Sequence, residues 1–232
     1  MEEAPVWISV NGQRSILLTC TPSETDALAT GHLLASGWIR SPAELHAVRT
    51  VTGPGGSCGV EVEMPAQAAE AGFALRAHMT AHGCGPRHYT DCAAGTRLLR
   101  QREAAVETPA PAVLAAGFRS LFAATDEASP EGGVHAAALF DGAGLHHAAV
   151  DVARHCAVDR VIGIAAMAGD DLGRYGLVLT SRVSGVIALK AVLSGVSWVA
   201  SRSMATSLAH DLAAAVRMPL LERAARVHRG PR

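Results

Sequence analysis

The chain has 232 residues, of which 49% are hydrophobic and 18% are charged. A chain of this length and composition can bury a substantial core, so it is not a disordered protein. Its 20 basic and 21 acidic residues are mixed along the chain and leave a formal net charge of −1. It therefore carries no basic footprint for nucleic acid, whereas a small anionic ligand is compatible with this charge pattern.

The cysteines and the apolar segments indicate where the protein works. The chain begins with two acidic residues after Met1, where a signal peptide needs basic ones, and its apolar stretches are too short or too interrupted to span a bilayer. Five cysteines at irregular spacing do not suggest a disulfide framework. We expect a cytoplasmic protein with reduced thiols, no membrane and no nucleic-acid partner.

The N-terminal third predicts a β-hairpin followed by a helix. Two β-rich runs, residues 5–10 and 14–19, flank an Asn-Gly pair, which is a strong hairpin signal because both residues tolerate positive φ. Residues 21–39 predict a helix with Ser23 as its N-cap and Gly37 near its end. Beyond it we expect a loop at residues 53–59 and strands at 60–64 and 73–79.

The rest of the chain predicts an α/β arrangement. Residues 96–106 and 111–125 have helical patterns, separated by the breaker "TPAP". Strands and helices then alternate. The expected strands are residues 134–140, 176–181, 197–202 and 219–223, and the expected helices are 155–167, 184–195 and 206–216. Such alternation is typical of an α/β sandwich around a sheet with parallel or mixed strands.

Several segments carry a family resemblance. The segments "GGVHAAALFDGAG", "DVARHCAVDRVIG", "LTSRVSGVIALKA" and "VASRSMATSLAHDLA", together with the opening hairpin and its Thr-Pro-led helix, resemble FdhD, the formate dehydrogenase accessory sulfurtransferase family. They cover nearly the whole chain in the family's order. The resemblance implies a cytidine-deaminase-like three-layer α/β sandwich with a small N-terminal β-rich part, and a cytoplasmic homodimer. It divides the chain into a hairpin, helix and strands at 1–80, a cysteine loop at 81–93 and an α/β core at 94–232, which together form one continuous unit.

The resemblance also implies a sulfur carrier. Members of this family accept sulfane sulfur from a cysteine desulfurase and pass it to a guanine-dinucleotide molybdenum cofactor for formate dehydrogenase or a related molybdoenzyme. Their Cys-Gly-x-Cys-Gly motif falls here on Cys84-Gly85-Pro86-Arg87, which keeps only the first cysteine. A persulfide carrier needs a thiolate, and neighbouring cationic groups favour one. We expect His82, Arg87 and His88 to assist Cys84.

The binding of the cofactor, as substrate, is expected at basic and polar residues of the core. These are His135, Arg154, His155, Arg182, Ser184, Arg223 and Arg226. Paired glycines before His135 permit close approach of a ligand, and Arg154 at the start of a helix suits phosphate oxygens. Two structural alternatives stay open: His135 is a core histidine, and Arg154 forms a structural pair with Asp159 of the same helix.

Other hypotheses follow from departures from the family pattern. The second motif cysteine is missing, the "TSRVS" loop is one residue shorter, and the C-terminal Gly-Phe is replaced by Glu222-Arg223. These changes favour an FdhD-like scaffold used for another small-molecule reaction, sulfur-incorporating or not, or a non-enzymatic module that binds a cofactor. Fold alone does not separate these functions.

A metal site in the cysteine loop is the remaining alternative. His82, Cys84, His88 and Cys92 offer a Cys2His2 set, yet their spacing fits no recognised zinc module and no Cys-x-x-Cys occurs. We therefore expect no metal of the protein's own. Cys58 is interpreted as a loop thiol, and Cys20 and Cys156 as core residues.

Overall fold

The computed structural model describes residues 2–81 and 107–224. The predicted hairpin is confirmed: β1 (Ala4–Val10) and β2 (Gln13–Cys20) pair antiparallel. Asn11 and Gly12 turn the chain with φ of 49° and 81°, the left-handed geometry that an Asn-Gly hairpin requires. The Asn11 side chain further accepts a hydrogen bond from the Met64 N–H and donates one to the Met64 carbonyl, both at 3.0 Å, which fixes the turn against the neighbouring strand.

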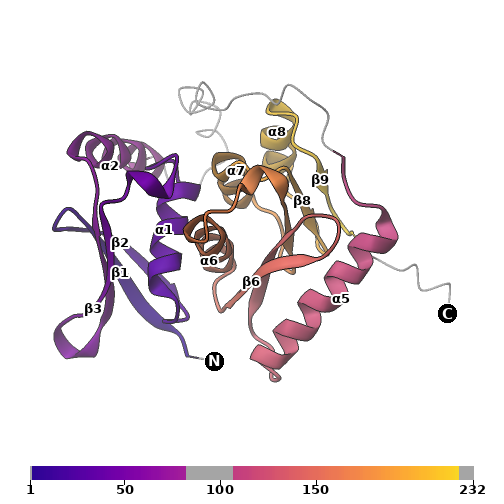
Figure 1. The fold of residues 1–232 in the computed structure, drawn as a ribbon, viewed down its shortest axis with the longest axis horizontal. Coiled ribbons are helices and arrows are strands. Elements are labelled where there is room, and N and C mark those ends of the chain that lie inside the picture. Colours follow the sequence, from indigo (N-terminus) through magenta and orange to yellow (C-terminus); the bar gives the residue numbers. More distant parts are fainter. Residues whose placement is uncertain (1, 82–106, 225–232) are drawn as a thin grey trace.

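The hairpin belongs to a four-stranded sheet with the order β2-β1-β4-β3. In it β1 runs parallel to β4 (Cys58–Glu63), and β4 runs antiparallel to β3 (Ala47–Thr52). The prediction omitted β3, whose residues are all half-buried or exposed and so lack a clear buried alternation. Helices α1 (Thr25–Ala35) and α2 (Ala66–Ala81) accompany this sheet (Figure 1).

Two details of the predicted N-terminal part are wrong. The strand expected at residues 73–79 is part of α2, because an Ala-rich segment from Ala66 onward carries the helix through the apolar run. The N-cap of α1 is Glu24, in the left-handed conformation at φ 44°, and not Ser23. The Ser23 hydroxyl instead accepts a hydrogen bond from Arg160 at 3.3 Å, a long-range contact that local sequence does not reveal.

The second sheet has five strands in the order β6-β5-β7-β8-β9. Their bounds are β5 (His135–Phe140), β6 (Leu145–Asp151), β7 (Gly176–Leu179), β8 (Trp198–Ser201) and β9 (Leu220–Leu221). Strand β5 is antiparallel to both β6 and β7, whereas β7, β8 and β9 are parallel, so the sheet is mixed as predicted. The prediction missed β6, because the polar pair His146-His147 interrupts the apolar sequence pattern of this strand.

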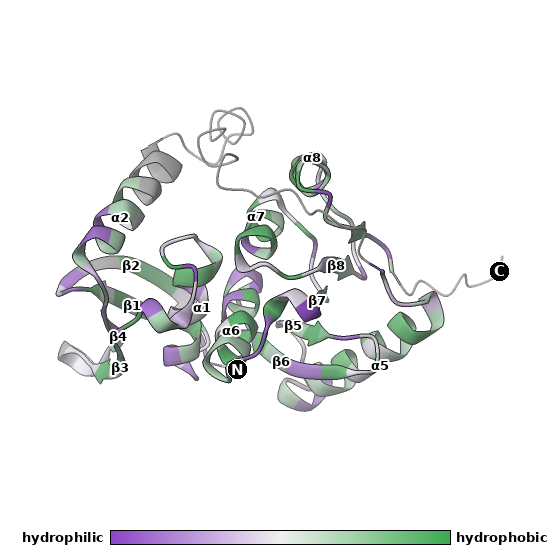
Figure 2. Ribbon diagram, turned by 45° about the horizontal axis from the view of Figure 1, so that its top comes forward, coloured by the Kyte–Doolittle hydropathy of each residue, from purple (hydrophilic) through white to green (hydrophobic). Residues whose placement is uncertain are grey.

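Helices cover both faces of this sheet and make three layers (Figures 1 and 2). The helices are α5 (Pro111–Ala128), α6 (Arg154–Met167), α7 (Gly185–Ser194) and α8 (Ser207–Ala215). Short 3-10 turns occur at η1 (Pro42–Glu44), η2 (Pro54–Gly56) and η3 (Leu172–Arg174). One cluster joins Phe118 and Leu121 of α5 to Phe140 and Trp198, and a larger one joins the opposite face to α6, α7 and α8. The predicted α/β sandwich is confirmed.

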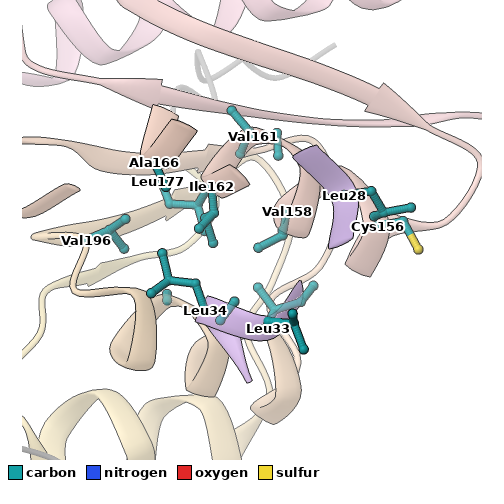
Figure 3. Packing of buried hydrophobic residues seen from close by; sticks show 14 of the residues in the cluster. Leu28, Leu33, Leu34, Cys156, Val158, Val161, Ile162, Ala166, Leu177 and Val196 are labelled. Carbon is teal, nitrogen blue, oxygen red and sulfur yellow. The ribbon is translucent and has the colours of Figure 1, made fainter. Parts of the chain in front are cut away.

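Helix α1 joins the two sheets by packing against α6 (Figure 3). The two helices touch at glycines: a Cβ on Gly31 would lie 1.7 Å from the carbonyl oxygen of Asp159, and a Cβ on Gly163 would lie 1.8 Å from that of Ala27. Leu28 and Leu33 pack beside this crossing in one continuous core. The N-terminal sheet is thereby fixed to the core through backbone-to-backbone contact.

No helix in the part of the chain that the structure describes is long and apolar enough to cross a membrane. The helix predicted at residues 96–106 lies outside the described residues.

Candidate functional site

One edge of the five-stranded sheet collects the predicted site residues. Strands β6, β7, β8 and β9 all run in the same direction, and β5 begins where they end, since His135 pairs with Asp151. We call this side the carboxyl edge. Ligands of α/β sheets bind preferentially outside the carboxyl ends of the strands. The predicted residues His135, Arg154, His155, Arg182, Ser184 and Arg223 all follow or begin strands at this edge.

The start of α6 lies at the carboxyl edge, directly after the outer strand β6. Its N-cap is Ala153, which has an extended backbone and offers no side-chain cap. The preceding Asp151 accepts a hydrogen bond from the Ala153 N–H at 2.8 Å. A helix start without a capping side chain leaves N–H groups that suit an anionic ligand. Gly132 and Gly133, with φ of 77° and 78°, lead the chain into β5 beside it.

Arg154 and the imidazoles of His135 and His155 lie close together at this helix start. The pKa of His155 is lowered from 6.5 to about 4 by burial first, and then by the positive charges of Arg154 and Lys190. The pKa of His135 is also lowered, by burial and by Arg154. Both imidazoles are therefore mainly neutral at pH 7. An anion bound here would face the guanidinium of Arg154 and two neutral imidazoles.

Two nitrogens of this group are buried without a hydrogen-bond partner among the described residues: Arg154 Nε and His155 Nε2. Most buried polar atoms in folded proteins have a partner, because an unpaired one costs about 1–3 kcal/mol. The arrangement therefore favours binding of a group with oxygen acceptors for Arg154. The neutral imidazole of His155 supplies either a donor or an acceptor, depending on its tautomer.

Behind the helix start lies a buried ionic cluster that sequence reasoning missed. Lys190 Nζ donates to both carboxylate oxygens of Asp159 at 2.7 and 2.9 Å, and His32 Nδ1 lies 2.9 Å from Oδ2. The side chains of Asp159 and Lys190 are only 1% and 8% exposed. Burial alone raises the pKa of Asp159, but Lys190 and His32 together lower it below its usual value. Lys190 is the single lysine of the chain and lies in an apolar helix. A lone charge in such a helix is the sequence signal that could have indicated a buried ion pair.

The alternative pairing of Arg154 with Asp159 is wrong for this structure. Asp159 faces α1 and α7, where Lys190 and His32 bind it, and no contact with Arg154 is present among the described side chains. Among the described residues, therefore, no carboxylate forms an ion pair with Arg154, which suits it to a ligand at the carboxyl edge.

The other predicted residues lie in loops after the strands. Arg182 is exposed after β7, and Ser184 is the N-cap of α7, where its Oγ accepts a hydrogen bond from Ile187 N–H at 3.4 Å. Arg223 is exposed after β9 and donates to Met204 Sδ at 3.4 Å. A bridge between Val183 and Ala205 holds the loops after β7 and β8 side by side. Ser184 thus has a structural role, while Arg182 and Arg223 have free access to solvent.

The predicted sulfur-carrying residues fall elsewhere in the chain. Cys84, with His82, Arg87 and His88, lies outside the described residues, as do Arg226 and the alternative metal ligand Cys92. Their roles stay predictions from the sequence.

A cavity of about 500 Å³ lies at the opposite end of α6. Its lining includes Leu34, Arg40, Asp170 and Gly195, and none of the predicted site residues. We place the candidate site at the carboxyl edge instead, because the charged and unpartnered groups are there.

These features define an α/β protein with an anion-suited site at the carboxyl ends of a mixed sheet. The FdhD/NarQ family model matches residues 1–228, so the chain belongs to the FdhD/NarQ family. The sulfur carrier protein FdhD of Xanthomonas campestris pv. campestris (strain B100) is 30% identical over 221 residues, which cover 94% of this chain and 78% of that protein. The one of Bacillus subtilis (strain 168) is 28% identical over 211 residues, with 91% and 79% covered.

A solved structure supports the fold. The chain is similar to the crystal structure of a formate dehydrogenase accessory protein from Desulfotalea psychrophila, with a TM-score of 0.71 and 20% identity, over 96% of this chain and 83% of the other. The resemblance seen in the sequence is therefore confirmed at the level of family and fold.

Proposed function

We propose that this protein is a cytoplasmic sulfur carrier that serves a formate dehydrogenase or a related molybdoenzyme. Its membership of the FdhD/NarQ family and the names of its relatives support this role. The structural observation that carries the proposal is the group at the start of α6, where Arg154 Nε and His155 Nε2 are buried without partners. That group suits an anionic acceptor of sulfur.

The first step of the proposal is the loading of Cys84. Its thiolate attacks the outer sulfur of a persulfide on a cysteine desulfurase, the S–S bond of the donor breaks, and the donor thiolate leaves. Cys84 then carries one sulfane sulfur as a persulfide, and one cysteine is sufficient for this. His82, Arg87 and His88 favour the thiolate by their proximity in sequence.

The second step is the binding of the acceptor. In the proposal this substrate is a guanine-dinucleotide molybdenum cofactor, whose pyrophosphate lies at the start of α6 within reach of Arg154. His135 and His155 supply hydrogen bonds, and Arg182 and Arg223 contribute charge from the loops after β7 and β9. The S–S bond of the persulfide then breaks, Cys84 leaves as the thiolate, and the molybdenum of the substrate would supply the two electrons that convert the sulfane sulfur to its sulfido ligand. Arg226 remains a further candidate, and we propose a homodimer as the working form.

A cellular test addresses the whole function. The chain is expressed in a bacterium that lacks its own FdhD-type sulfur carrier, and formate dehydrogenase activity is measured in extracts. We expect the wild type to restore activity, Cys84→Ala to abolish it, and Cys92→Ala to retain it. Full activity of Cys84→Ala would refute the role of Cys84, and failure of a well-expressed wild type would favour a scaffold used for another reaction.

A binding test addresses the acceptor site alone. Calorimetric titration with GDP measures affinity for the guanine nucleotide part of the substrate. We expect Arg154→Ala to raise the dissociation constant roughly tenfold or more, the loss of one charge-assisted contact. Arg174→Ala is the matched control, because Arg174 is exposed in η3 and away from the carboxyl edge. Equal affinity of the Arg154 variant and the wild type would exclude Arg154 from the site.

A further inference from the structure

Two cysteines far apart in the sequence meet in the core. Cys20 ends β2 and Cys156 is the third residue of α6, and their side chains are 0% and 4% exposed. Their Sγ atoms and a carboxylate oxygen of Asp151 all lie within 4.8 Å of one another. The two thiols therefore bring the end of β2 next to the helix that begins the candidate site; Figure 3 shows Cys156 near the start of α6.

The backbone around both cysteines is held in place. Asp151 forms a buried ion pair with Arg160 and accepts a hydrogen bond from the Thr21 N–H at 3.3 Å. Arg160 also donates to the carbonyl oxygen of Thr21 at 2.8 Å, and the Val152 N–H donates to the Thr21 hydroxyl at 3.3 Å. The residue after Cys20 is thus tied to the segment that leads into α6. This network keeps the two sulfur atoms close without a bond between them.

We propose that Cys20 and Cys156 form a redox-convertible dithiol, which closes to a disulfide when the protein meets a peroxide. The two cysteines are free thiols in this structure. The proposal is independent of the sulfur-carrier role, because neither thiol is Cys84.

The electrostatics divide the roles of the two thiols. The hydrogen bond from Cys156 is the main cause that lowers the pKa of Cys20, and Arg160 adds to it against the effects of burial and Asp151. The same hydrogen bond and burial raise the pKa of Cys156. Cys20 is therefore the thiolate-forming member, and Cys156 holds the proton that the pair shares.

The reaction balances with hydrogen peroxide as the oxidant. The Cys20 thiolate attacks one peroxide oxygen, the O–O bond breaks, and hydroxide leaves, which gives a sulfenic acid on Cys20. The Cys156 sulfur then attacks the Cys20 sulfur, the S–O bond breaks, and the departing hydroxide takes the Cys156 proton as water. Two thiols and one peroxide thus yield one disulfide and two waters. Peroxide is small enough to reach the pair during local opening of the fold.

A metal site is the competing use of the same atoms. Three ligand atoms are available from described residues, and a tetrahedral thiolate site needs a fourth. Asp151 already accepts hydrogen bonds from Ala153 and Thr21, besides its ion pair with the cationic Arg160. A disulfide needs neither a fourth ligand nor a change at Asp151, so it fits these contacts better.

Peptide mapping tests the proposal directly. Cleavage after Arg and Lys places the five cysteines in five different peptides: 15–40, 50–76, 77–87, 88–97 and 155–160. The reduced full-length protein is treated with hydrogen peroxide, remaining thiols are alkylated, and the digest is analysed by mass spectrometry without reduction. We expect a cross-linked pair of 15–40 with 155–160, about 2 Da lighter than the sum of the two thiol peptides.

Variants and a thermal melt complete the test. Cys20→Ser and Cys156→Ser should each abolish the cross-link, whereas Cys58→Ser, a control on the half-buried thiol of β4, should leave it unchanged. Peroxide should raise the Tm of the wild type by roughly 5 °C or more, because the disulfide closes a long loop, and both serine variants should lose this shift.

Three outcomes would overturn the proposal. The first is recovery of both alkylated peptides from a folded, peroxide-treated wild type. The second is a cross-link of either peptide to one of the other three. The third is one equivalent of zinc bound by the reduced wild type and lost in both serine variants, which would assign the pair to a metal. If one serine variant does not fold, the other variant and the wild-type map still decide the matter.

Discussion

Replacing Lys190 by methionine should destabilise the protein through the charge it leaves behind. Asp159 is 1% exposed, and Lys190 binds both of its oxygens at 2.7 and 2.9 Å. Removing one partner of a buried ion pair typically costs about 3–5 kcal/mol, because the remaining charge is uncompensated. His32 still contacts Asp159 at 2.9 Å, so we expect a loss near the lower value, about 3 kcal/mol.

Urea unfolding followed by circular dichroism measures this loss. The double variant Asp159→Asn/Lys190→Met should be more stable than the sum of the two single losses predicts, by roughly 1–3 kcal/mol, since neither charge is then left alone. Arg49→Met is the control: it breaks the exposed pair of Arg49 with Glu63, whose side chains are 62% and 55% exposed, and should cost less than about 1 kcal/mol.

The contribution of Asp159 to stability should change in opposite directions in the wild type and in Lys190→Met as the pH falls. In the wild type the pKa of Asp159 is lowered on folding, so its contribution is present above its ordinary value of 3.8 and is lost as the pH falls through the folded value. In Lys190→Met burial dominates and raises that pKa, so the destabilisation should shrink as the pH falls. A Lys190→Met variant as stable as the Arg49 control, or a loss that does not change with pH, would refute this reasoning.

Two further predictions concern helix α6. Gly163→Ala should lower the free energy of unfolding in urea by about 1–3 kcal/mol, because its Cβ would lie 1.8 Å from the Ala27 carbonyl oxygen. Gly144→Ala is the control and should be nearly neutral, since its Cβ meets open space; equal losses would contradict the close crossing of α1 and α6. For His155 the folded pKa of about 4 lies below 6.5, so the wild type should lose stability as the pH falls from 6.5 towards 4. In thermal melts the Tm of His155→Gln should decrease less than that of the wild type over this pH range. Identical pH profiles of the two proteins would show that His155 is not held neutral.

Much of the fold is visible in local sequence. The Asn-Gly hairpin and the alternation of strands and helices after residue 133 predict the elements, because turn chemistry and periodicity are local properties. Strand β3 and the helical conformation of residues 73–79 were missed because neither segment shows a local pattern that separates strand from helix. Tertiary contact decides such segments.

The sequence pointed to the half-buried residues of the candidate site, but not to the partners of its fully buried residues. His135, Arg154 and His155 follow glycine and strand signals, and the sheet brings them to one edge. The partners of Asp159 come from α1 and α7, and the contact of Cys20 with Cys156 joins two distant segments. These pairings join segments far apart in the chain, as does the crossing of α1 and α6 at Gly31 and Gly163, and no local pattern specifies them.

The central claim, that this chain carries sulfur on Cys84, is tested most directly by mass spectrometry. The reduced protein is incubated with a cysteine desulfurase and cysteine, and peptides are mapped without reduction. The account predicts an added mass of about 32 Da, one sulfur atom, on the peptide 77–87 that contains Cys84. A folded and reduced protein that gains no sulfur, or gains it only on the peptide 88–97 with Cys92, would contradict it.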